Sequence, residues 1–281
     1  MRFAIAVIFS LFSLALPVRA EVAVVTSIEP LALLIKDIGG EDVSVTSLVP
    51  NAGSIHHYSM RMSDRIKVED ADLVVLVGAG LEPFLDKLSS LDPDKMVRID
   101  RLEGVTTLAL AEEDDHGHGH IGVDPHLWLS PFNTALLAQQ IAVRLGQAIP
   151  AKADMFAARA VAFNTDQSSL LTEAHLSQGT RYVAYHNAVA YLLAPLGIQL
   201  RGVLTSVNES RLGMRSLYAI KQEVQGAENV CVLVQKQNRH ISEKILGKAH
   251  YAELDVMADK GDYDNYLQYL AAMLKAIENC H

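Results

Sequence analysis

The chain has 281 residues, of which 50% are hydrophobic and 20% are charged, and this length is enough for two domains of ordinary size. Its 33 acidic residues outnumber its 24 basic residues, so the formal net charge is −9 at pH 7. A surface of this sign argues against binding to nucleic acid or to an anionic membrane, and it is compatible with binding of cations.

Residues 1–20 have the features of a secretory signal peptide. Arg2 gives a positive start, residues 3–16 form an apolar run, and Ala20 ends a small-residue cleavage site. The run is too short to span a bilayer, no later stretch is suited to do so, and no cysteine near the cleavage site can carry a lipid. We therefore expect the mature chain, 21–281, to be exported and to have no membrane anchor.

Cys231 and Cys280 are the only cysteines of the chain. An even pair in a chain directed to an oxidising compartment favours one disulfide, which would tie the last helix to a strand. Two free buried thiols are the alternative. Closing a loop of this size stabilises a fold by about 3–4 kcal/mol in the chain-entropy description.

Strands and helices alternate along the first half of the chain, which predicts a parallel sheet covered by helices on both faces. In such a sheet, ligands collect at the loops beyond the carboxyl ends of the strands. We expect strands over 22–26, 43–49, 72–77 and 96–99, and helices over 30–38, 63–70 and 81–88.

The second half repeats this plan after two longer helices. A helix is expected over 131–146, and a run over 151–174 without Gly or Pro predicts a rod of roughly 36 Å. We interpret the run as a bridge between two α/β lobes: 21–150 as the N-terminal lobe, 151–176 as the bridging helix and 177–281 as the C-terminal lobe. The further strands are expected over 181–185, 198–204, 230–234 and 252–256, with helices over 188–196, 212–225, 241–248 and 263–278.

The segment 112–131 holds two kinds of histidine. His116, His118 and His120 alternate with glycines behind four carboxylates, so we expect no stable element there, only mobile imidazoles that attract a cation without fixing its geometry. His126 differs, because Asp124-Pro125 stiffens the approach and Leu127-Trp128-Leu129 would anchor the backbone in a core. One rigid candidate ligand therefore lies beside a flexible, metal-attracting tract.

Four candidate ligands share one property, which is a position at or just past the end of an apolar strand or anchored segment. Three imidazoles and a carboxylate suit a borderline divalent cation, most simply a tetrahedral zinc ion. Each candidate also has another interpretation. His57 could replace His56 as the ligand, and His126 could be a core histidine with satisfied hydrogen bonds. His186 could cap a helix, and Asp255 could be a turn residue. The four candidates are His56, His126, His186 and Asp255.

At this point the sequence resembles a known family, the solute-binding proteins of zinc and manganese ABC transporters, and is close to the periplasmic zinc-binding, ZnuA-like type. The resemblance covers nearly all of the mature chain. The run ADLVV-VG-LE-F and the segment HLWLSP are specific, and their joint order is stronger than either alone. The matching segments are TSIEPLALLIKDIGG, SIHHYSMRMSD, ADLVVLVGAGLEPFL, DPHLWLSP, YHNAVAYLLAPLGI and LDV.

The resemblance implies a ligand for each candidate position. In the family, the first histidine lies two residues before the tyrosine of an S-x-H-x-Y motif, which selects His56 over His57. A histidine at the third position, where manganese members look to have a glutamate, favours zinc. An acidic histidine-rich loop and a disulfide matching Cys231 with Cys280 are typical of the zinc branch. The other implied ligands are His126, His186 and Asp255.

The function implied is capture of Zn²⁺ in the periplasm by a monomeric binding protein and delivery to the permease of an ABC importer. His116, His118 and His120 would be a low-affinity collecting site, or an acidic linker with incidental histidines. A manganese-binding homologue is the first alternative. A secreted zinc hydrolase is a second, but no H-E-x-x-H pair occurs and Asp255 would fill the open coordination position. A metal-buffering or adhesive surface protein is a third, disfavoured by the missing lipidation cysteine.

Overall fold

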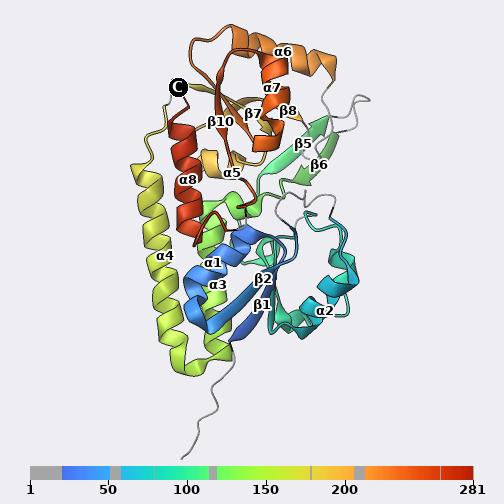
Figure 1. Ribbon diagram of the computed structural model, residues 1–281, viewed down its shortest axis with the longest axis vertical. Helices are drawn as coiled ribbons and strands as arrows, with labels where there is room; N and C mark the ends of the chain where they lie inside the picture. The colour runs from blue at the N-terminus through green and yellow to red at the C-terminus, as the bar shows by residue number, and fades with distance from the viewer. Residues whose placement is uncertain are drawn as a thin grey trace, which may run out of the picture.

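Two four-stranded parallel sheets form the framework of the protein, and helices surround each sheet (Figure 1). The computed structural model describes residues 21–50, 58–78, 80–113, 119–177, 179–205, 213–259 and 261–280, with the backbone alone described at 85, 110–113 and 119–121. The first sheet has the strand order β2 (Val43–Ser47), β1 (Val22–Thr26), β3 (Leu73–Leu76), β4 (Met96–Arg98), and the second has the order β10 (His250–Glu253), β9 (Val230–Val234), β7 (Arg181–His186), β8 (Leu200–Thr205). The expected α/β class with two parallel sheets is confirmed.

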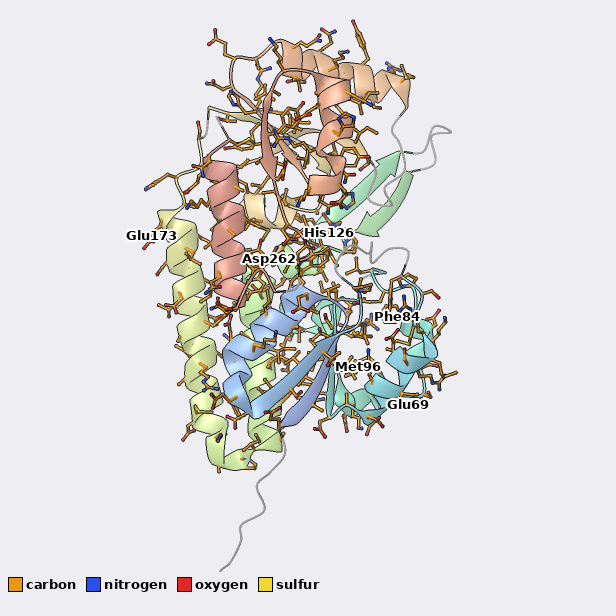
Figure 2. All side chains as sticks on the ribbon, viewed as in Figure 1. Glu69, Phe84, Met96, His126, Glu173 and Asp262 are labelled. Atoms are coloured by element: carbon orange, nitrogen blue, oxygen red, sulfur yellow. A yellow bond between two sulfur atoms is a disulfide. The ribbon has the colours of Figure 1, made fainter. Side chains whose placement is uncertain are left out.

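The first sheet is buried on both faces. In β1 (Val22–Thr26), Val24 belongs to a core formed with α1 (Glu29–Gly39) and α3 (Pro131–Ala148), whereas Val25 belongs to a second core under α2 (Met62–Asp70). This alternation is the two-residue period of a strand. Phe84 and Met96 lie on the α2 side (Figure 2). The remaining strands of the sheet are β2 (Val43–Ser47), β3 (Leu73–Leu76) and β4 (Met96–Arg98).

The second sheet is built in the same way. In β7 (Arg181–His186), Tyr182 and Ala184 join the core that also holds Val24, whereas Val183 joins a third core that includes residues of α6 and α7. Apolar residues on both sides of each strand are what a parallel sheet between helix layers requires. The other elements are β8 (Leu200–Thr205), β9 (Val230–Val234), β10 (His250–Glu253), α5 (Ala190–Leu193), α6 (Met214–Gln225), α7 (Arg239–Leu246) and α8 (Tyr266–Glu278).

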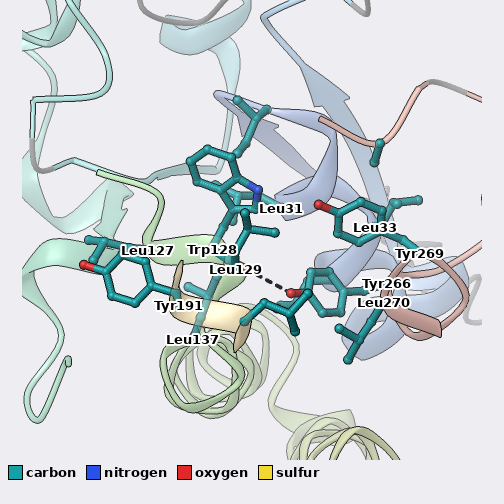
Figure 3. Packing of buried hydrophobic residues seen from close by; sticks show 14 of the residues in the cluster. Leu31, Leu33, Leu127, Trp128, Leu129, Leu137, Tyr191, Tyr266, Tyr269 and Leu270 are labelled. Atoms are coloured by element: carbon teal, nitrogen blue, oxygen red, sulfur yellow. Dashed lines mark hydrogen bonds between the residues drawn. The ribbon is translucent and has the colours of Figure 1, made fainter. Parts of the chain in front are cut away.

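The largest core is continuous between the two sheets, and Trp128 lies in it with 1% of its surface exposed. Its Nε1 donates a hydrogen bond to the carbonyl of Val256 at 3.2 Å, beyond the end of β10. The hydroxyl of Tyr266 on α8 donates to the carbonyl of Trp128 at 2.9 Å (Figure 3). The two sheets are therefore joined by shared packing and buried hydrogen bonds as well as by the chain.

The long helix expected in the middle of the chain is α4 (Ala153–Glu173), which begins after the 3-10 turn Pro150–Lys152. Its 21 residues make a rod of about 32 Å along one side of the molecule (Figure 1). Gln167 joins it to α3, since it accepts from Thr134 and donates to the carbonyl of Pro131, both at 2.8 Å. Within the described ranges, none of the helices combines the length and apolar composition needed to cross a membrane.

The expected disulfide between Cys231 and Cys280 is present. Cys231 lies in β9 and Cys280 follows the end of α8, so the bond ties the last helix to the second sheet. Both residues are buried. The sequence separation of 49 residues corresponds to a loop-closure stabilisation of roughly 4 kcal/mol.

The helix expected over 81–88 is wrong, because the segment contains only a 3-10 turn, Leu85–Leu88. Two local features compete with an α-helix. Pro83 has no amide hydrogen to donate, and the buried carboxylate of Glu82 accepts the amides of Val77 and Gly78, both at 2.8 Å. Gly78 has a φ of 80°, a left-handed value that favours glycine.

The expectation that no stable element forms in the histidine-rich segment is also wrong for its two flanks. An antiparallel pair, β5 (Ala109–Glu113) and β6 (Gly119–Val123), sets Glu112 opposite His120. Its base is closed by a bond from the amide of Asp124 to the carbonyl of Leu108 at 2.9 Å. Since the ladder uses backbone groups, it extends from this base into residues whose side chains suggest a loop.

Candidate metal centre

His126 lies in a buried segment between the β5-β6 hairpin and α3. A 3-10 turn, Leu127–Leu129, follows it, and all three side chains are at most 1% exposed. Ser130 then caps α3, because its hydroxyl accepts the amide of Asn133 at 3.3 Å. The ring of His126 is itself 2% exposed, so the core-anchored setting expected from the sequence is present.

The orientation of the His126 ring is set by Asp124. One oxygen of this carboxylate, Oδ1, is 2.7 Å from Nδ1 of the ring and also accepts the amide of His126 at 3.0 Å. A carboxylate in this position is an acceptor, so Nδ1 carries the ring proton and Nε2 presents its lone pair. Metal-ligating imidazoles usually donate their other ring N–H to a carboxylate or carbonyl in this way, which fixes the ring for the metal.

His186 approaches His126 from the second sheet. It is the last residue of β7, where the carboxyl ends of the parallel strands lie, and it is 9% exposed. Its Nε2 is 3.1 Å from Nε2 of His126, and the two rings meet edge to face with centroids 4.9 Å apart. In Figure 2, His126 lies between the half of the molecule that contains the first sheet and the half that contains the second.

The spacing of the two nitrogens fits one metal ion. Two imidazole nitrogens at 2.0–2.1 Å from a tetrahedral zinc lie roughly 3.3 Å apart. The observed separation of 3.1 Å is close to this value. Two side chains from separate segments, one before α3 and one at the end of β7, therefore already have the spacing of ligands to a single tetrahedral cation.

The carboxylate of Asp255 is bonded within its own loop. The residue follows β10 and is half-buried, and its Oδ2 accepts the amide of Asp259 at 2.6 Å. Burial raises the pKa of its carboxyl, and the nearby carboxylates of Asp259 and Asp262 raise this pKa further, while the hydrogen bonds from the Asp259 amide and from the Tyr263 hydroxyl lower it. Among the described residues, Asp255 forms a group with Asp259 and Asp262 whose ligand atoms all lie within 4.8 Å, and it forms no such group with the two imidazoles.

The backbone beside Asp255 is nevertheless close to the histidine segment. Val256, the next residue, accepts hydrogen bonds at its carbonyl from Trp128 Nε1 at 3.2 Å and from the Tyr269 hydroxyl at 2.8 Å. A small pocket beside His186 is lined by Gln235 and Val256, among others. The structure thus brings the Asp255 segment near the imidazole pair while its carboxylate is engaged within its own loop.

Several sequence-predicted positions lie outside the described residues. These are His56, its neighbour His57, and the loop residues His116 and His118. His120 lies on β6, where only the backbone is described. For His56, the nearest fixed point is Tyr58, whose hydroxyl donates to Asp64 at 2.6 Å and whose ring packs edge to face on Phe84.

Two important residues were not assigned a role from the sequence. The sequence predicts Asp124 only as part of a stiff approach to His126, although the Asp-x-His spacing also allows the carboxylate to reach back to the ring, as it does here. Trp128 was interpreted as core, and its bond to Val256 across 128 residues has no local sequence signal. The Asp-x-His spacing is the one signal that sequence analysis had available.

The fold is shared with solved metal-binding solute-binding proteins. A crystal structure of ZnuA has a TM-score of 0.74 and 24% identity, and the alignment covers 93% of this chain and 99% of that chain. FpvC of Pseudomonas aeruginosa, solved in complex with Mn²⁺, has a TM-score of 0.73 and 20% identity, with coverage of 93% and 100%. At these identities the likeness establishes the fold alone.

Sequence comparison establishes the family. The family described as "Zinc-uptake complex component A periplasmic" (ZnuA) matches residues 24–280, and the chain belongs to it. The protein named high-affinity zinc uptake system protein ZnuA of Yersinia pestis is 28% identical over 93% of this chain and 92% of its own length. The protein of the same name from Haemophilus ducreyi is 30% identical over 82% of each chain.

Proposed function

We propose that this chain is a periplasmic solute-binding protein that captures Zn²⁺ and delivers it to the permease of a high-affinity ABC-type zinc importer. Membership of the zinc-uptake family supports this function. The observation that carries it is the pair of imidazole nitrogens of His126 and His186, which come from the segment before α3 and from the end of β7 and lie 3.1 Å apart. Because both halves supply a ligand, a loaded chain differs from an empty one in a way that a permease can detect.

The proposed ligand set is His56, His126, His186 and Asp255. His56 is chosen over His57 because the resemblance to the family places the ligand two residues before the tyrosine of the S-x-H-x-Y motif, here Tyr58, which contacts Asp64 and Phe84. Asp255 would complete the set by turning its carboxylate away from the Asp259 amide toward the imidazoles. A set closed in this way has no open position for a substrate, which is the arrangement of a transport site and not of a hydrolase. The family is one of transport binding proteins.

Zinc is favoured over manganese by the chemistry of the donors. Imidazole suits zinc, whereas carboxylates, carbonyls and water suit manganese. His126 and His186 supply two neutral nitrogen donors at tetrahedral spacing. The manganese-bound FpvC shares the fold only, so it carries no argument for manganese here.

The histidine-rich segment is proposed as a collecting site. His116, His118 and His120 would bind zinc weakly between and along the two strands of the hairpin, whose backbone returns to the centre at Asp124. Deletion of 114–120 should leave one tight zinc per chain and slow zinc uptake at low metal concentration. Unchanged stoichiometry, affinity and uptake rate would show that the segment is an incidental acidic linker.

We further propose that residues 1–20 direct the chain to the periplasm and that the mature protein is a monomer. The Cys231–Cys280 disulfide is consistent with an oxidising compartment. The lobes would comprise 21–150 and 177–281, with 151–176 as the bridge, and the shared core at Trp128 would limit their relative motion.

The test is a competition titration of the mature, metal-stripped chain with zinc and manganese against a chelator of known affinity. The wild type should bind one zinc tightly and should keep it in excess manganese. His186→Ala should weaken zinc binding by more than about 100-fold, since removal of a ligand exceeds the 10–100-fold effect of losing a ligand's support. His250→Ala, an exposed histidine on β10, is the matched control and should bind as the wild type does.

If His186→Ala binds zinc as tightly as the wild type does, the metal must lie elsewhere. A triple variant, His116→Asn, His118→Asn and His120→Asn, would then show whether it sits on the hairpin. Uptake through a permease needs a second assay, in which loss of the gene should impair growth under zinc starvation and added zinc should restore it.

A further inference from the structure

Tyr191 connects the two sides of the metal centre. It lies on α5, five residues after His186, and it is 2% exposed. Its hydroxyl donates to the carbonyl of Asp124 at 2.8 Å and accepts the amide of Leu108 at 2.9 Å. Leu108 and Asp124 are the two residues that close the base of the β5-β6 hairpin, where the Asp124 amide donates to the Leu108 carbonyl at 2.9 Å.

We propose that Tyr191 is a positioning residue of the zinc site: its hydroxyl, delivered from the segment after His186, fixes Asp124 and thereby the ring of His126. This inference rests on the proposed zinc capture. One oxygen of the Asp124 carboxylate accepts hydrogen bonds from both the amide and Nδ1 of His126. A shift of the Asp124 backbone therefore moves the acceptor that decides which nitrogen of His126 is free for the metal.

The hydroxyl is suited to this task because it donates and accepts at the same time. Burial, with a smaller contribution from Asp124, raises the pKa of Tyr191 to about 12, while the bond from Leu108 lowers this pKa. The phenol is therefore neutral at any physiological pH and keeps its proton for the carbonyl of Asp124. His186 and Tyr191 lie five residues apart, at the end of β7 and on α5, so this short segment supplies one ligand and also orients the opposite ligand.

The experiment compares Tyr191→Phe with Tyr182→Phe, using the full mature chain. Tyr182 is the matched control, because it is also 2% exposed and lies on β7, but its hydroxyl bonds to Thr180 and to the carbonyl of Ser177, at 3.4 Å, and not to the Asp124 segment. Zinc affinity is measured by chelator competition. The tautomer of His126 is measured in the metal-free protein by long-range ¹H–¹⁵N NMR of the imidazoles, assigned through the loss of signals in His126→Gln.

We expect Tyr191→Phe to weaken zinc binding by about tenfold relative to Tyr182→Phe. We also expect the metal-free variant to lose the single Nδ1-protonated signature of His126. In the double variant with Asp124→Asn, the further loss should stay within about twofold of Asp124→Asn alone, because both changes act through one carboxylate.

The proposal is overturned if Tyr191→Phe matches Tyr182→Phe in affinity and tautomer. It is equally overturned if affinity falls while the His126 tautomer is unchanged, or if the two losses simply add, since the hydroxyl would then contribute packing alone. A wild-type protein that binds no zinc would contradict the proposed function. The tautomer comparison needs no metal, and it would still decide whether Tyr191 positions His126.

Discussion

His126 and Asp255 are both proposed zinc ligands, and the structure prepares them to very different degrees. His126 is 2% exposed, its Nδ1 is held by Asp124 at 2.7 Å, and its Nε2 faces His186. Asp255 is half-buried, and its carboxylate accepts the amide of Asp259 at 2.6 Å in a loop of its own. One side chain is already in place, and the other must exchange a protein partner for the metal.

The comparison teaches that the ligands should contribute unequally to affinity. A preorganised ligand gives up little on binding, whereas a ligand engaged elsewhere first loses its existing hydrogen bonds. We therefore expect the imidazoles to determine whether zinc binds and Asp255 to adjust how tightly it binds. The following substitutions test this order.

The largest effect should come from removing the prepared ligand. His126→Ala should weaken zinc binding by more than about 100-fold, because it removes a fixed donor and leaves the buried Asp124 carboxylate without its bond to the ring, although the bond to the amide of residue 126 remains. Chelator competition measures the affinity. His240→Ala, at an exposed position, serves as the control, and an equal loss in both variants would contradict the assignment.

The second largest effect should come from changing Asp124, the carboxylate that orients the ring of His126. Asp124→Asn keeps the size of the side chain but replaces an acceptor that is 1% exposed, and it should cost about 10–100-fold in zinc affinity. Asp42→Asn, which changes a carboxylate paired with Lys152 far from the centre, is the control. If Asp124→Asn binds zinc as tightly as this control does, the orientation of His126 does not depend on Asp124.

A smaller effect is expected at the engaged ligand. Asp255→Ala should reduce zinc affinity by about tenfold or less, because binding through Asp255 must offset the loss of its bond to Asp259 and the burial of its charge. Asp154→Ala, at an exposed position at the start of α4, is the control and should have no effect. A loss at Asp255 as large as that at His126 would remove the distinction between the two ligands.

The smallest effect should be a gain. Tyr263 donates a hydrogen bond to Asp255, so Tyr263→Phe removes one contact that holds the carboxylate in its loop. A single hydrogen bond contributes roughly 0.5–1.5 kcal/mol, and the low end corresponds to a rise in zinc affinity of about twofold. Titration beside the wild type measures the rise. A fall in affinity would mean that the Tyr263 hydroxyl helps to place Asp255 for binding.

Much of the fold follows from the pattern of the sequence. The apolar, β-branched runs at 22–26 and 230–234 predict their strands to the residue, because a buried parallel strand has few alternatives. The segment 81–88 was misjudged, because a side chain, Glu82, accepts backbone amides at its start. The β5-β6 hairpin was missed because its ladder depends on a base closed by tertiary contacts of Leu108 and Asp124.

The candidate site also has a part that can be predicted from the sequence and a part that cannot. His126 and His186 could be singled out because each ends an anchored apolar segment, and their approach to 3.1 Å follows from the two sheets sharing one core. The engagement of Asp255 with Asp259 could not be predicted, since it depends on the path of a loop rather than on periodicity. The hydrogen bonds of Tyr191 could not be predicted either, because the partners of its hydroxyl lie 67 and 83 residues away in the sequence.

The measurement that tests the central claim most directly is anomalous diffraction at the zinc edge from crystals of the zinc-loaded mature chain. We predict one strong peak between His126 and His186, about 2.0–2.1 Å from each Nε2. An oxygen of Asp255, released from the Asp259 amide, should face the same peak. A peak confined to the histidine-rich hairpin, with the two Nε2 atoms still in contact with each other, would contradict the account.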